Sequence, residues 1–382
     1  MPNNKDLNIQ MVDLINQHAK IEKEYNKALQ DVIHSAAFIN GPAVKQFEHE
    51  FAKYLKVKHV IGCGNGTDAL QIALMALDLK PGDEVITTSF TFVATAEVVK
   101  LLGLKLVLVE PDPDTFNINP QKIEQAISPH TKAIIPVHLY GQAADMDAIM
   151  KIAEHRDIWV IEDSAQATGG TFQLPDGSRK NLGTIGHIGC TSFFPSKNLG
   201  AMGDGGALMT NDDELANKIH QIRNHGAAVK YYHDTVGVNS RLDSIQAALL
   251  SVKLRHLDRY IAARRKAADF YDSAFENLKN IVIPYRSSYA YHAFHQYSLK
   301  ILKPKRDELR EYLKSCGIPT MIYYPVPLHL QKAYSDGSLA KGSLPISEHL
   351  SDIVLSLPMH TELTEEQLSY ISEKLTDYVK KY

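Results

Sequence analysis

Between residues 60 and 210, short apolar runs alternate with amphipathic segments, and this alternation constrains the fold more than any other feature of the chain. The apolar runs cover residues 106–109, 133–137 and 158–161, and they lack the polar alternation of strands with one wet face; residues 84–88 are also strand-like. Such runs are typical of strands buried on both faces, and strands that alternate with helices form a mainly parallel α/β sheet. Ligands collect at the carboxyl ends of such strands.

The pattern changes after Arg241. Residues 242–271 are rich in Ala, Leu and Arg and predict one long helix or two joined helices, whereas residues 281–382 mix short strands with helices. A chain of 382 residues also exceeds what one compact core usually holds. We therefore predict a large α/β domain over residues 1–250, with an N-terminal helix, and a smaller α+β domain over residues 251–382.

Composition narrows the class of protein. The formal net charge of -3 gives no electrostatic reason to expect nucleic acid or a membrane surface as partner. Cys63, Cys190 and Cys316 lie far apart without metal-ligand spacing, and they are typical of reduced thiols, so no metal site is expected. The N-terminus is polar, and no apolar run is long enough to span a bilayer. We expect a cytoplasmic protein.

A glycine-rich turn precedes a predicted helix in Gly62-Cys-Gly-Asn-Gly66-Thr67-Asp68. Glycines at this place let backbone amides turn toward an anion, and the helix amino terminus favours negative charge. Thr67 can add a hydroxyl contact to a phosphate. The alternative is a tight turn in which Thr67 or Asp68 caps the helix. The spacing fits neither a Walker loop nor a dinucleotide fingerprint.

Asp163 follows the strand 158–161, with Gln166 three residues later. A buried carboxylate needs a partner, and a protonated pyridine nitrogen would be suitable. Gln166 could then donate to a phenolate oxygen on the same ring, and Phe92, just beyond another strand, could lie flat on that ring. The ordinary alternatives are a helix cap for Asp163 and a core position for Phe92.

Lys197 lies in the small-residue segment Thr191-Ser-Phe-Phe-Pro-Ser-Lys197-Asn-Leu-Gly200. A lysine there can swing between a Schiff base and a free amine, and partial burial would lower its pKa. Ser192 is placed to reach a phosphate. Alone, Lys197 is an exposed loop lysine; together with Asp163 and the glycine-rich turn, it predicts a site for pyridoxal 5'-phosphate (PLP). Asn239 and Arg241 precede a helix as caps, or bind an anion across a subunit boundary.

Several motifs in order resemble the DegT/DnrJ/EryC1/StrS family of sugar aminotransferases, over essentially the whole chain. They are Phe38-Ile-Asn-Gly41, Gly66-Thr-Asp-Ala-Leu70, Ile135-Pro-Val-His-Leu-Tyr-Gly141, Glu162-Asp-Ser-Ala-Gln166, Ser192-Phe-Phe-Pro-Ser-Lys197, Asn239-Ser-Arg241 and Tyr324-Pro-Val-Pro-Leu-His329. The resemblance implies an α/β fold of type I, similar to aspartate aminotransferase, with a mainly parallel seven-stranded sheet sandwiched by helices.

The resemblance also implies roles for individual residues. Lys197 would carry PLP as a Schiff base and move the proton of the 1,3-shift, with Asp163 on the pyridinium and Gln166 on the ring oxygen. Gly66, Thr67 and Ser192 would hold the phosphate, Phe92 would stack on the ring, and Asn239 would reach the phosphate of the partner subunit in a homodimer with shared sites. The sugar would be contacted by the following residues: Phe38, Ser196, Arg241, Tyr323, Tyr324 and His329.

The implied reaction is ping-pong transamination from glutamate to a keto group of a nucleotide-linked sugar. Residues 131–149 resemble the branch that aminates C3 of UDP-2-acetamido-2-deoxy-3-keto-glucuronate, used in cell-surface polysaccharide synthesis. Phe38 and Tyr323 depart from that branch, which has tyrosine and histidine there. Enzymes of dTDP-3-keto-6-deoxyhexoses or of 4-keto sugars are therefore alternatives, as is a regulatory protein that binds PLP without turnover. A decarboxylase or desulfurase on the same fold has no support from the cysteines.

Overall fold

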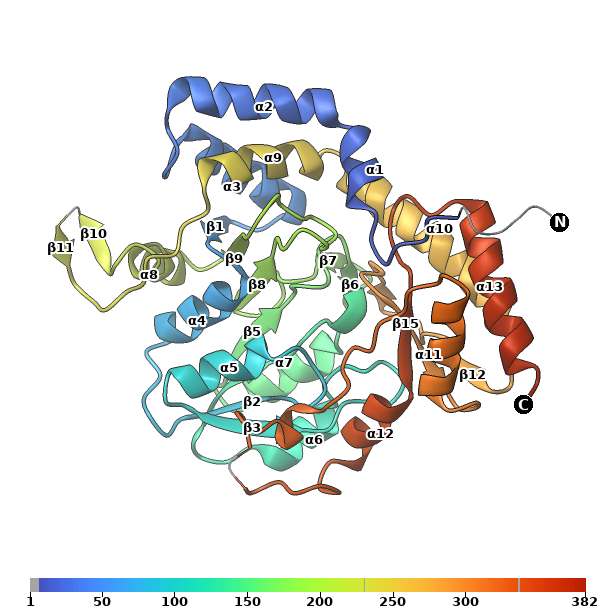
Figure 1. Ribbon diagram of the computed structural model, residues 1–382. Coiled ribbons are helices and arrows are strands. Elements are labelled where there is room, and N and C mark those ends of the chain that lie inside the picture. Colours follow the sequence, from blue (N-terminus) through green and yellow to red (C-terminus); the bar gives the residue numbers. More distant parts are fainter. Residues whose placement is uncertain (1–6, 230, 336) are drawn as a thin grey trace.

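The computed structural model describes residues 7–229, 231–335 and 337–382. Its centre is a seven-stranded sheet with the strand order β1-β9-β8-β5-β4-β2-β3 (Figure 1). These strands are β1 (His59–Cys63), β2 (Glu84–Thr88), β3 (Lys105–Val109), β4 (Thr131–Ile135), β5 (Trp159–Asp163), β8 (Ile188–Ser192) and β9 (Gly206–Thr210). β9 runs antiparallel to its two neighbours, β1 and β8, and the other neighbouring strands of this sheet are parallel to one another. The predicted mainly parallel α/β sheet is confirmed.

Both faces of the sheet are buried under helices, which explains the uninterrupted apolar runs. Successive strand residues point to opposite faces, so that Val85 belongs to one apolar cluster and Ile86 to another. One face is covered by α4 (Gly66–Ala76), α5 (Ala94–Leu101) and α8 (Asp213–Ile222). The opposite face is covered by α3 (Pro42–Leu55), α6 (Pro120–Ala126), α7 (Met146–Glu154) and α9 (Ser244–Leu254).

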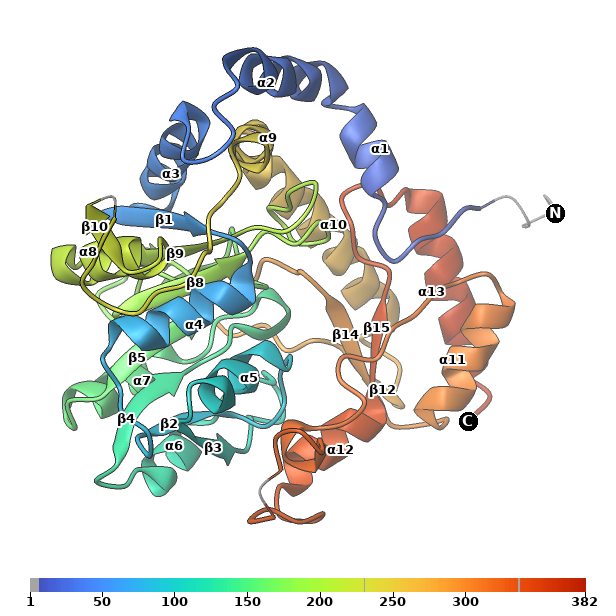
Figure 2. The same cartoon turned by 60° about the vertical axis from the view of Figure 1, so that its left-hand side comes forward.

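The second apolar core lies beside the sheet, in the C-terminal part of the chain (Figure 2). It is built on the small sheet β12-β14-β15, made by β12 (Ile281–Val282), β14 (Tyr297–Ile301) and β15 (Val354–Leu357). The helices around it are α10 (Leu257–Phe275), α11 (Arg306–Ser315), α12 (Pro345–Ile353) and α13 (Glu365–Val379). Leu7 and Ile9 also pack here, and Ala267 is the first α10 residue to do so. The boundary predicted at residue 250 falls inside α9.

The N-terminal helical pattern is divided in the structure. Residues 8–33 show a single periodicity in the sequence, but the chain forms α1 (Leu14–Ala19) and α2 (Glu22–Ser35), with Asp13 capping α1. The predicted helix over residues 242–271 likewise consists of α9 and α10, which join at residues 255–256. Of the two alternatives predicted for that segment, two joined helices are confirmed.

Two hairpins leave the main sheet. One is formed by β6 (Thr171–Gln173) and β7 (Arg179–Asn181), and β6 also pairs with β13 (Ala290–Tyr291). The other hairpin, β10 (Ala227–Val229) with β11 (Tyr232–His233), projects from the body of the molecule (Figure 1). Within the described residues, no helix combines the length and apolar character required to cross a bilayer.

Candidate active site

The carboxyl ends of β1, β2, β4, β5 and β8 meet at one edge of the sheet, above a cavity of about 650 Å³. Parallel strands bring the segments that follow them to the same edge, which is why motifs far apart in the sequence come together. The lining includes Gly66, Thr67, Phe92, Asp163, Gln166, Ser192, Ser196, Lys197, Tyr323 and Tyr324, all predicted as site residues. Residues that the sequence analysis did not assign also line it, among them Asp68, Tyr140, Asp204, His295 and Gln296.

The glycine-rich turn forms the amino terminus of α4. Asn65 caps the helix, accepting a hydrogen bond from the Asp68 N–H at 2.8 Å, so the caps predicted for Thr67 or Asp68 are not found. The first N–H groups of a helix have no partner inside the helix, and they suit an anion. A side chain at Gly66 would place its Cβ only 2.7 Å from the Cβ of Ser192. Glycine at this position therefore allows the start of α4 to approach Ser192 closely.

Replacing Gly66 with alanine is expected to weaken PLP binding about tenfold or more, because the methyl group takes space that a phosphate needs beside Ser192. Titration of the apoprotein with PLP measures the effect. The double variant Gly66→Ala with Ser192→Gly relieves the contact between the two side chains. Affinity that returns fully in the double variant would show that the alanine acted by distorting Ser192 and not by filling the phosphate site.

Asp163 is the last residue of β5, and its side chain is 6% exposed. Its carboxylate accepts hydrogen bonds from the Thr95 hydroxyl at 2.8 Å and the Ala165 N–H at 3.2 Å. Burial raises the pKa of Asp163, while these hydrogen bonds and the Lys197 charge oppose the rise. The described residues give it no ion pair within 4 Å. A buried carboxylate in this state would be stabilised by a cationic group in the cavity.

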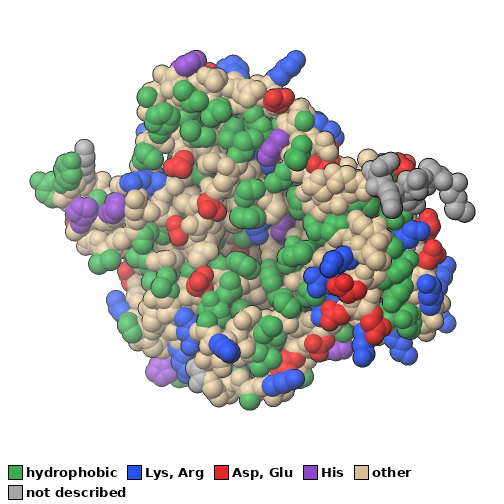
Figure 3. Space-filling view, in the orientation of Figure 1, with side chains coloured by type: hydrophobic (Ala, Val, Ile, Leu, Met, Phe, Trp, Pro, Cys, Tyr) green, Lys and Arg blue, Asp and Glu red, His purple; other side chains and the backbone are tan. Residues whose placement is uncertain are grey.

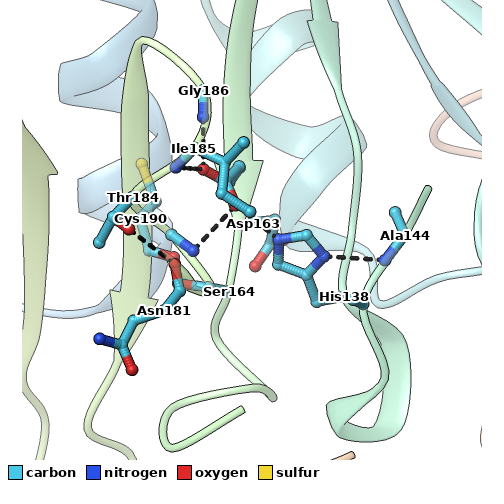
Figure 4. A network of polar contacts seen from close by, with 12 residues as sticks. His138, Ala144, Asp163, Ser164, Asn181, Thr184, Ile185, Gly186 and Cys190 are labelled. Atoms are coloured by element: carbon cyan, nitrogen blue, oxygen red, sulfur yellow. Dashed lines mark hydrogen bonds and ion pairs between the residues drawn. The ribbon is translucent and has the colours of Figure 1, made fainter. Parts of the chain in front are cut away.

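A second buried carboxylate, next to Asp163 in the chain, ties β5 to its neighbours, and Figure 4 labels its partners His138, Ile185 and Gly186. Glu162 accepts from His138 at 2.8 Å and from the backbone N–H groups of Gly183, Ile185 and Gly186. Burial would raise the pKa of Glu162, but these donors reverse the shift and lower it. The His138 Nδ1 accepts from the Ala144 N–H, so the ring proton lies on Nε2 and points to Glu162. This network holds Asp163 in place.

Gln166 is oriented by two neighbours. Its side-chain oxygen accepts from the Tyr140 N–H at 2.7 Å, and its nitrogen donates to the Tyr324 hydroxyl at 3.0 Å. A side-chain amide carries two N–H groups, so one donor remains for a group in the cavity. Tyr324 also lies 6.0 Å from Phe92, ring centre to ring centre, and Phe92 is 52% exposed at the cavity. Phe92, the aromatic side chain predicted to cover a ring, therefore lies at the cavity with about half of its surface exposed.

Lys197 lies in the segment 193–200, which we call the lysine loop. The loop is closed by hydrogen bonds from the Lys197 N–H to the Phe194 carbonyl and from the Ala201 N–H to the Phe193 carbonyl. Burial lowers the pKa of Lys197 from 10.5 to about 8, and the nearby Asp163 carboxylate opposes that shift. A larger fraction of the amine is therefore uncharged near neutral pH than for an ordinary lysine, as a nucleophile requires.

The rate at which the apoprotein binds PLP covalently is expected to rise with pH up to about 8 and then to level off. Only the uncharged amine attacks an aldehyde, and Lys197 loses its proton near that pH. The rate of appearance of the visible band of protein-bound PLP measures this, with a free alkylamine under the same buffers as reference. A rate that keeps rising well above pH 8, as for the free amine, would contradict an acidic Lys197.

Four predicted site residues lie outside this cavity lining within the described chain. The Arg241 guanidinium donates to the Asn224 side chain at 2.9 Å, and Asn239 is exposed beside it in a backbone bridge to Asn224. Phe38 is exposed on the segment before α3. His329 is buried, with its Nδ1 2.8 Å from the Ser89 hydroxyl and its Nε2 3.1 Å from Glu348. A direct sugar contact predicted for His329 does not match this burial, because both ring nitrogens already have partners.

The residues present fit PLP on three independent grounds. Gly66 lets a helix amino terminus, which suits an anion, approach Ser192 closely at the cavity, Asp163 is a buried carboxylate that needs a cation, and Lys197 is an amine of lowered pKa in the same cavity. A phosphate, a pyridinium nitrogen and an aldehyde would meet these three groups in turn. Metal ligands are a different matter: among the described residues, no three His, Cys, Asp or Glu side chains gather in one place.

Curated relatives cover almost the whole chain. A protein of Geobacillus stearothermophilus named "Pleiotropic regulatory protein" is 49% identical over 98% of this chain and 100% of its own. A UDP-2-acetamido-2-deoxy-3-oxo-D-glucuronate aminotransferase of Pseudomonas aeruginosa is 46% identical over 97% of this chain and 100% of its own. A dTDP-3-amino-3,6-dideoxy-alpha-D-galactopyranose transaminase of Aneurinibacillus thermoaerophilus is 41% identical over 97% and 99%. Their names include both UDP-sugar and dTDP-sugar enzymes.

Solved structures agree with these relatives. A DegT DnrJ EryC1 StrS aminotransferase from Brucella abortus superposes with a TM-score of 0.92 at 42% identity, covering 97% of this chain and 99% of its own. The NtdA structure from Bacillus subtilis, with bound cofactor PMP, has a TM-score of 0.87 at 33% identity over 97% and 83%. The model of the DegT/DnrJ/EryC1/StrS aminotransferase family matches residues 19–376. The chain therefore belongs to this family of PLP-dependent sugar aminotransferases.

Proposed function

We propose that this aminotransferase moves an amino group from glutamate to C3 of UDP-2-acetamido-2-deoxy-3-keto-glucuronate, for the synthesis of a cell-surface polysaccharide. The convergence of Lys197, Asp163 and the Gly66 turn on one cavity carries the aminotransferase part of the proposal. The sugar rests on the 46% identity with the Pseudomonas aeruginosa enzyme of that substrate. The dTDP-3-keto-6-deoxyhexoses are the second substrate class, because an enzyme of that type is 41% identical.

In this proposal each side chain has a defined role. Lys197 would bind the cofactor aldehyde covalently and, as an uncharged amine, would take up and return a proton. Asp163 holds the proton of the ring nitrogen, and Gln166 donates to the ring oxygen with its free N–H. Gly66, Thr67 and Ser192 bind the phosphate, while Phe92 covers the ring from solvent. Bound there, PLP would supply the electron sink that makes a C–H bond next to nitrogen acidic.

The sugar side of the cavity has polar and aromatic side chains but little positive charge. The ionisable groups that line the whole cavity are Asp68, Asp163, Asp204, Lys197, His295 and tyrosines. A diphosphate, a uronate or glutamate each carries negative charge and needs cationic partners. We therefore propose that a second subunit completes the site in a homodimer, with its Asn239 and Arg241 placed toward the anions. The projecting β10–β11 hairpin supports this, because its apolar side chains are exposed, Val229 at 62% and Tyr232 at 71% (Figure 3).

Asn239→Ala is the variant that tests the shared site. Loss of one amide contact to the phosphate is expected to weaken PLP binding about tenfold, without loss of folding, because Asn239 is exposed within its own chain. Equilibrium titration of the apoprotein measures the affinity, and sedimentation measures whether the dimer persists. An unchanged affinity in a chain that is still dimeric would argue against a cofactor contact from the partner subunit.

The decisive experiment for the function is an absorbance spectrum before and after excess glutamate. Conversion of the visible band to that of the pyridoxamine form shows the first half-reaction, and the keto sugars are then supplied one by one. Faster return of the visible band with the UDP-linked uronate than with dTDP-3-keto-6-deoxyhexoses supports the proposed substrate. The reverse order would assign the chain to the second substrate class.

A regulatory protein that binds PLP without turnover is the candidate from another class. It is favoured by the name of the relative that is 49% identical over 98% of the chain. A band that appears with PLP but resists both glutamate and the keto sugars would support regulation. Turnover with any keto sugar would make catalysis the primary activity.

A further inference from the structure

His295 is a buried imidazole of the cavity that has no part in the roles described above. The side chain is 6% exposed and lines the cavity together with Lys197. Its Nδ1 has no hydrogen-bond partner among the described residues, and its Nε2 lies 3.5 Å from the amide nitrogen of Gln296. A buried polar atom without a partner calls for an explanation, and a role at the site is one, because this atom belongs to a residue that lines the cavity.

The backbone around His295 is fixed on two sides. The buried guanidinium of Arg264 donates to the carbonyl of His295 at 3.2 Å, and the Gln296 N–H donates to the Tyr140 carbonyl at 3.2 Å. The lysine loop is tied to the same segment, because the Asn198 side chain donates to the Ala293 carbonyl at 3.3 Å. The residue that follows Lys197 thus holds the chain two residues before His295. His295 and Lys197 therefore lie on two segments that contact one another.

The charge state of the His295 imidazole follows from its burial and from the charged groups near it. Burial lowers the pKa of His295 far below its usual value, and the nearby Lys197 and Arg264 charges lower it further. The charged group that acts on Lys197 is Asp163, on β5; Asp68 and Asp204 also line the cavity. His138 acts on Asp163 from behind the sheet. His295 therefore stays neutral, with one nitrogen that accepts and one that donates a hydrogen bond.

We propose that His295 is a positioning residue for Lys197: its imidazole forms a hydrogen bond with the lysine amine and directs that amine toward the cofactor aldehyde. The inference rests on the proposed role of Lys197. It concerns the lysine and not cofactor affinity in general, because the phosphate and ring-nitrogen contacts come from α4 and β5. Its consequence is that His295 governs how fast the covalent bond forms, while the non-covalent contacts govern how tightly the cofactor is held.

Comparing PLP with pyridoxamine phosphate separates these two effects. Pyridoxamine phosphate has the same phosphate and ring but no aldehyde, so it forms no bond with Lys197. In the His295→Leu apoprotein, the rate of appearance of the visible band with PLP is expected to fall about tenfold or more, the effect of one hydrogen bond to a reactive group. The dissociation constant of pyridoxamine phosphate is expected to stay within about twofold of that of the wild-type chain.

Two further variants serve as controls. His295→Gln keeps a side chain that donates and accepts, and it is expected to recover most of the rate. His360→Leu removes another buried imidazole near Arg264, outside the cavity lining, and it is expected to bind PLP at the wild-type rate. An unchanged rate in His295→Leu would overturn the inference. So would an equal loss of affinity for both ligands, since that marks a general packing role.

The proposed function fails in a different way. A wild-type chain that forms no visible band with PLP would remove the role of Lys197 and the reaction with it. A wild-type chain that forms the band at the same rate as His295→Leu leaves the reaction standing and removes only the role of His295. The wild-type chain alone therefore tests the proposed function, and its comparison with His295→Leu tests the role of His295.

Discussion

Lys197→Ala is expected to abolish transamination, with a loss in kcat of about four orders of magnitude or more, because no other amine lines the cavity of the described chain. The same variant is expected to lose the visible band of covalently bound PLP, while PLP still binds non-covalently through Gly66 and Ser192. Steady-state assays with glutamate and the keto sugar measure the first effect, and the absorbance spectrum of the PLP-loaded variant measures the second.

A matched lysine serves as control for this substitution. Lys180 lies exposed in the β6–β7 hairpin, and Lys180→Ala is expected to keep both the activity and the visible band. Wild-type turnover in Lys197→Ala would refute the assignment of the covalent cofactor site. A chain that loses turnover but keeps the band would place the covalent bond on another lysine, which peptide mapping after reduction would identify.

Asp163→Asn is the second variant with a large expected effect. The amide keeps the size of the side chain but cannot hold the ring nitrogen in its protonated form, so kcat is expected to fall about a hundred- to thousandfold. Because the Asp163 charge opposes the lowering of the Lys197 pKa, that pKa is expected to fall further in this variant. The pH dependence of PLP binding by the apoprotein, measured as for the wild-type chain, shows the direction.

Stability distinguishes a catalytic effect of Asp163→Asn from a folding defect. Burial raises the pKa of Asp163 in the folded state, so its ionised form opposes folding at pH values above that pKa. Without cofactor, the asparagine variant is therefore expected to unfold near neutral pH at the same or a higher temperature than the wild-type chain. Asp176→Asn, at the exposed tip of the β6–β7 hairpin, is expected to change neither activity nor stability. Full activity in Asp163→Asn would refute the pyridinium contact.

Much of the fold was predictable because local patterns and packing agree. The strand predicted at residues 84–88 has the observed bounds. The burial of β2 on both faces explains why its sequence shows no alternation. The split between α1 and α2 was not predictable, since the apolar period continues across Lys20 and Ile21 while the helix is interrupted there.

The candidate site was predictable where a motif follows a strand. Gly66, Asp163, Gln166 and Lys197 all line the cavity, as the topology of a parallel sheet requires. Their supports were hidden, because each is ordinary in its own segment. Thr95 looks like any threonine in the first turn of a helix, yet it donates to Asp163 across 68 positions of the chain. His295 opens an unremarkable strand segment, and only the tertiary structure brings it beside Lys197.

The cavity wall is drawn from two separate stretches of one polypeptide. The side chains proposed to hold PLP within a subunit lie between residues 66 and 197, whereas His295, Gln296, Tyr323 and Tyr324 come from beyond residue 290. Recombination between family members at the α9–α10 junction would therefore exchange His295, Gln296, Tyr323 and Tyr324 together and leave Gly66, Asp163 and Lys197 of the same subunit unchanged. Such hybrids would let sugar aminotransferases acquire new substrate preferences by recombination, without stepwise substitutions in an active site that already functions.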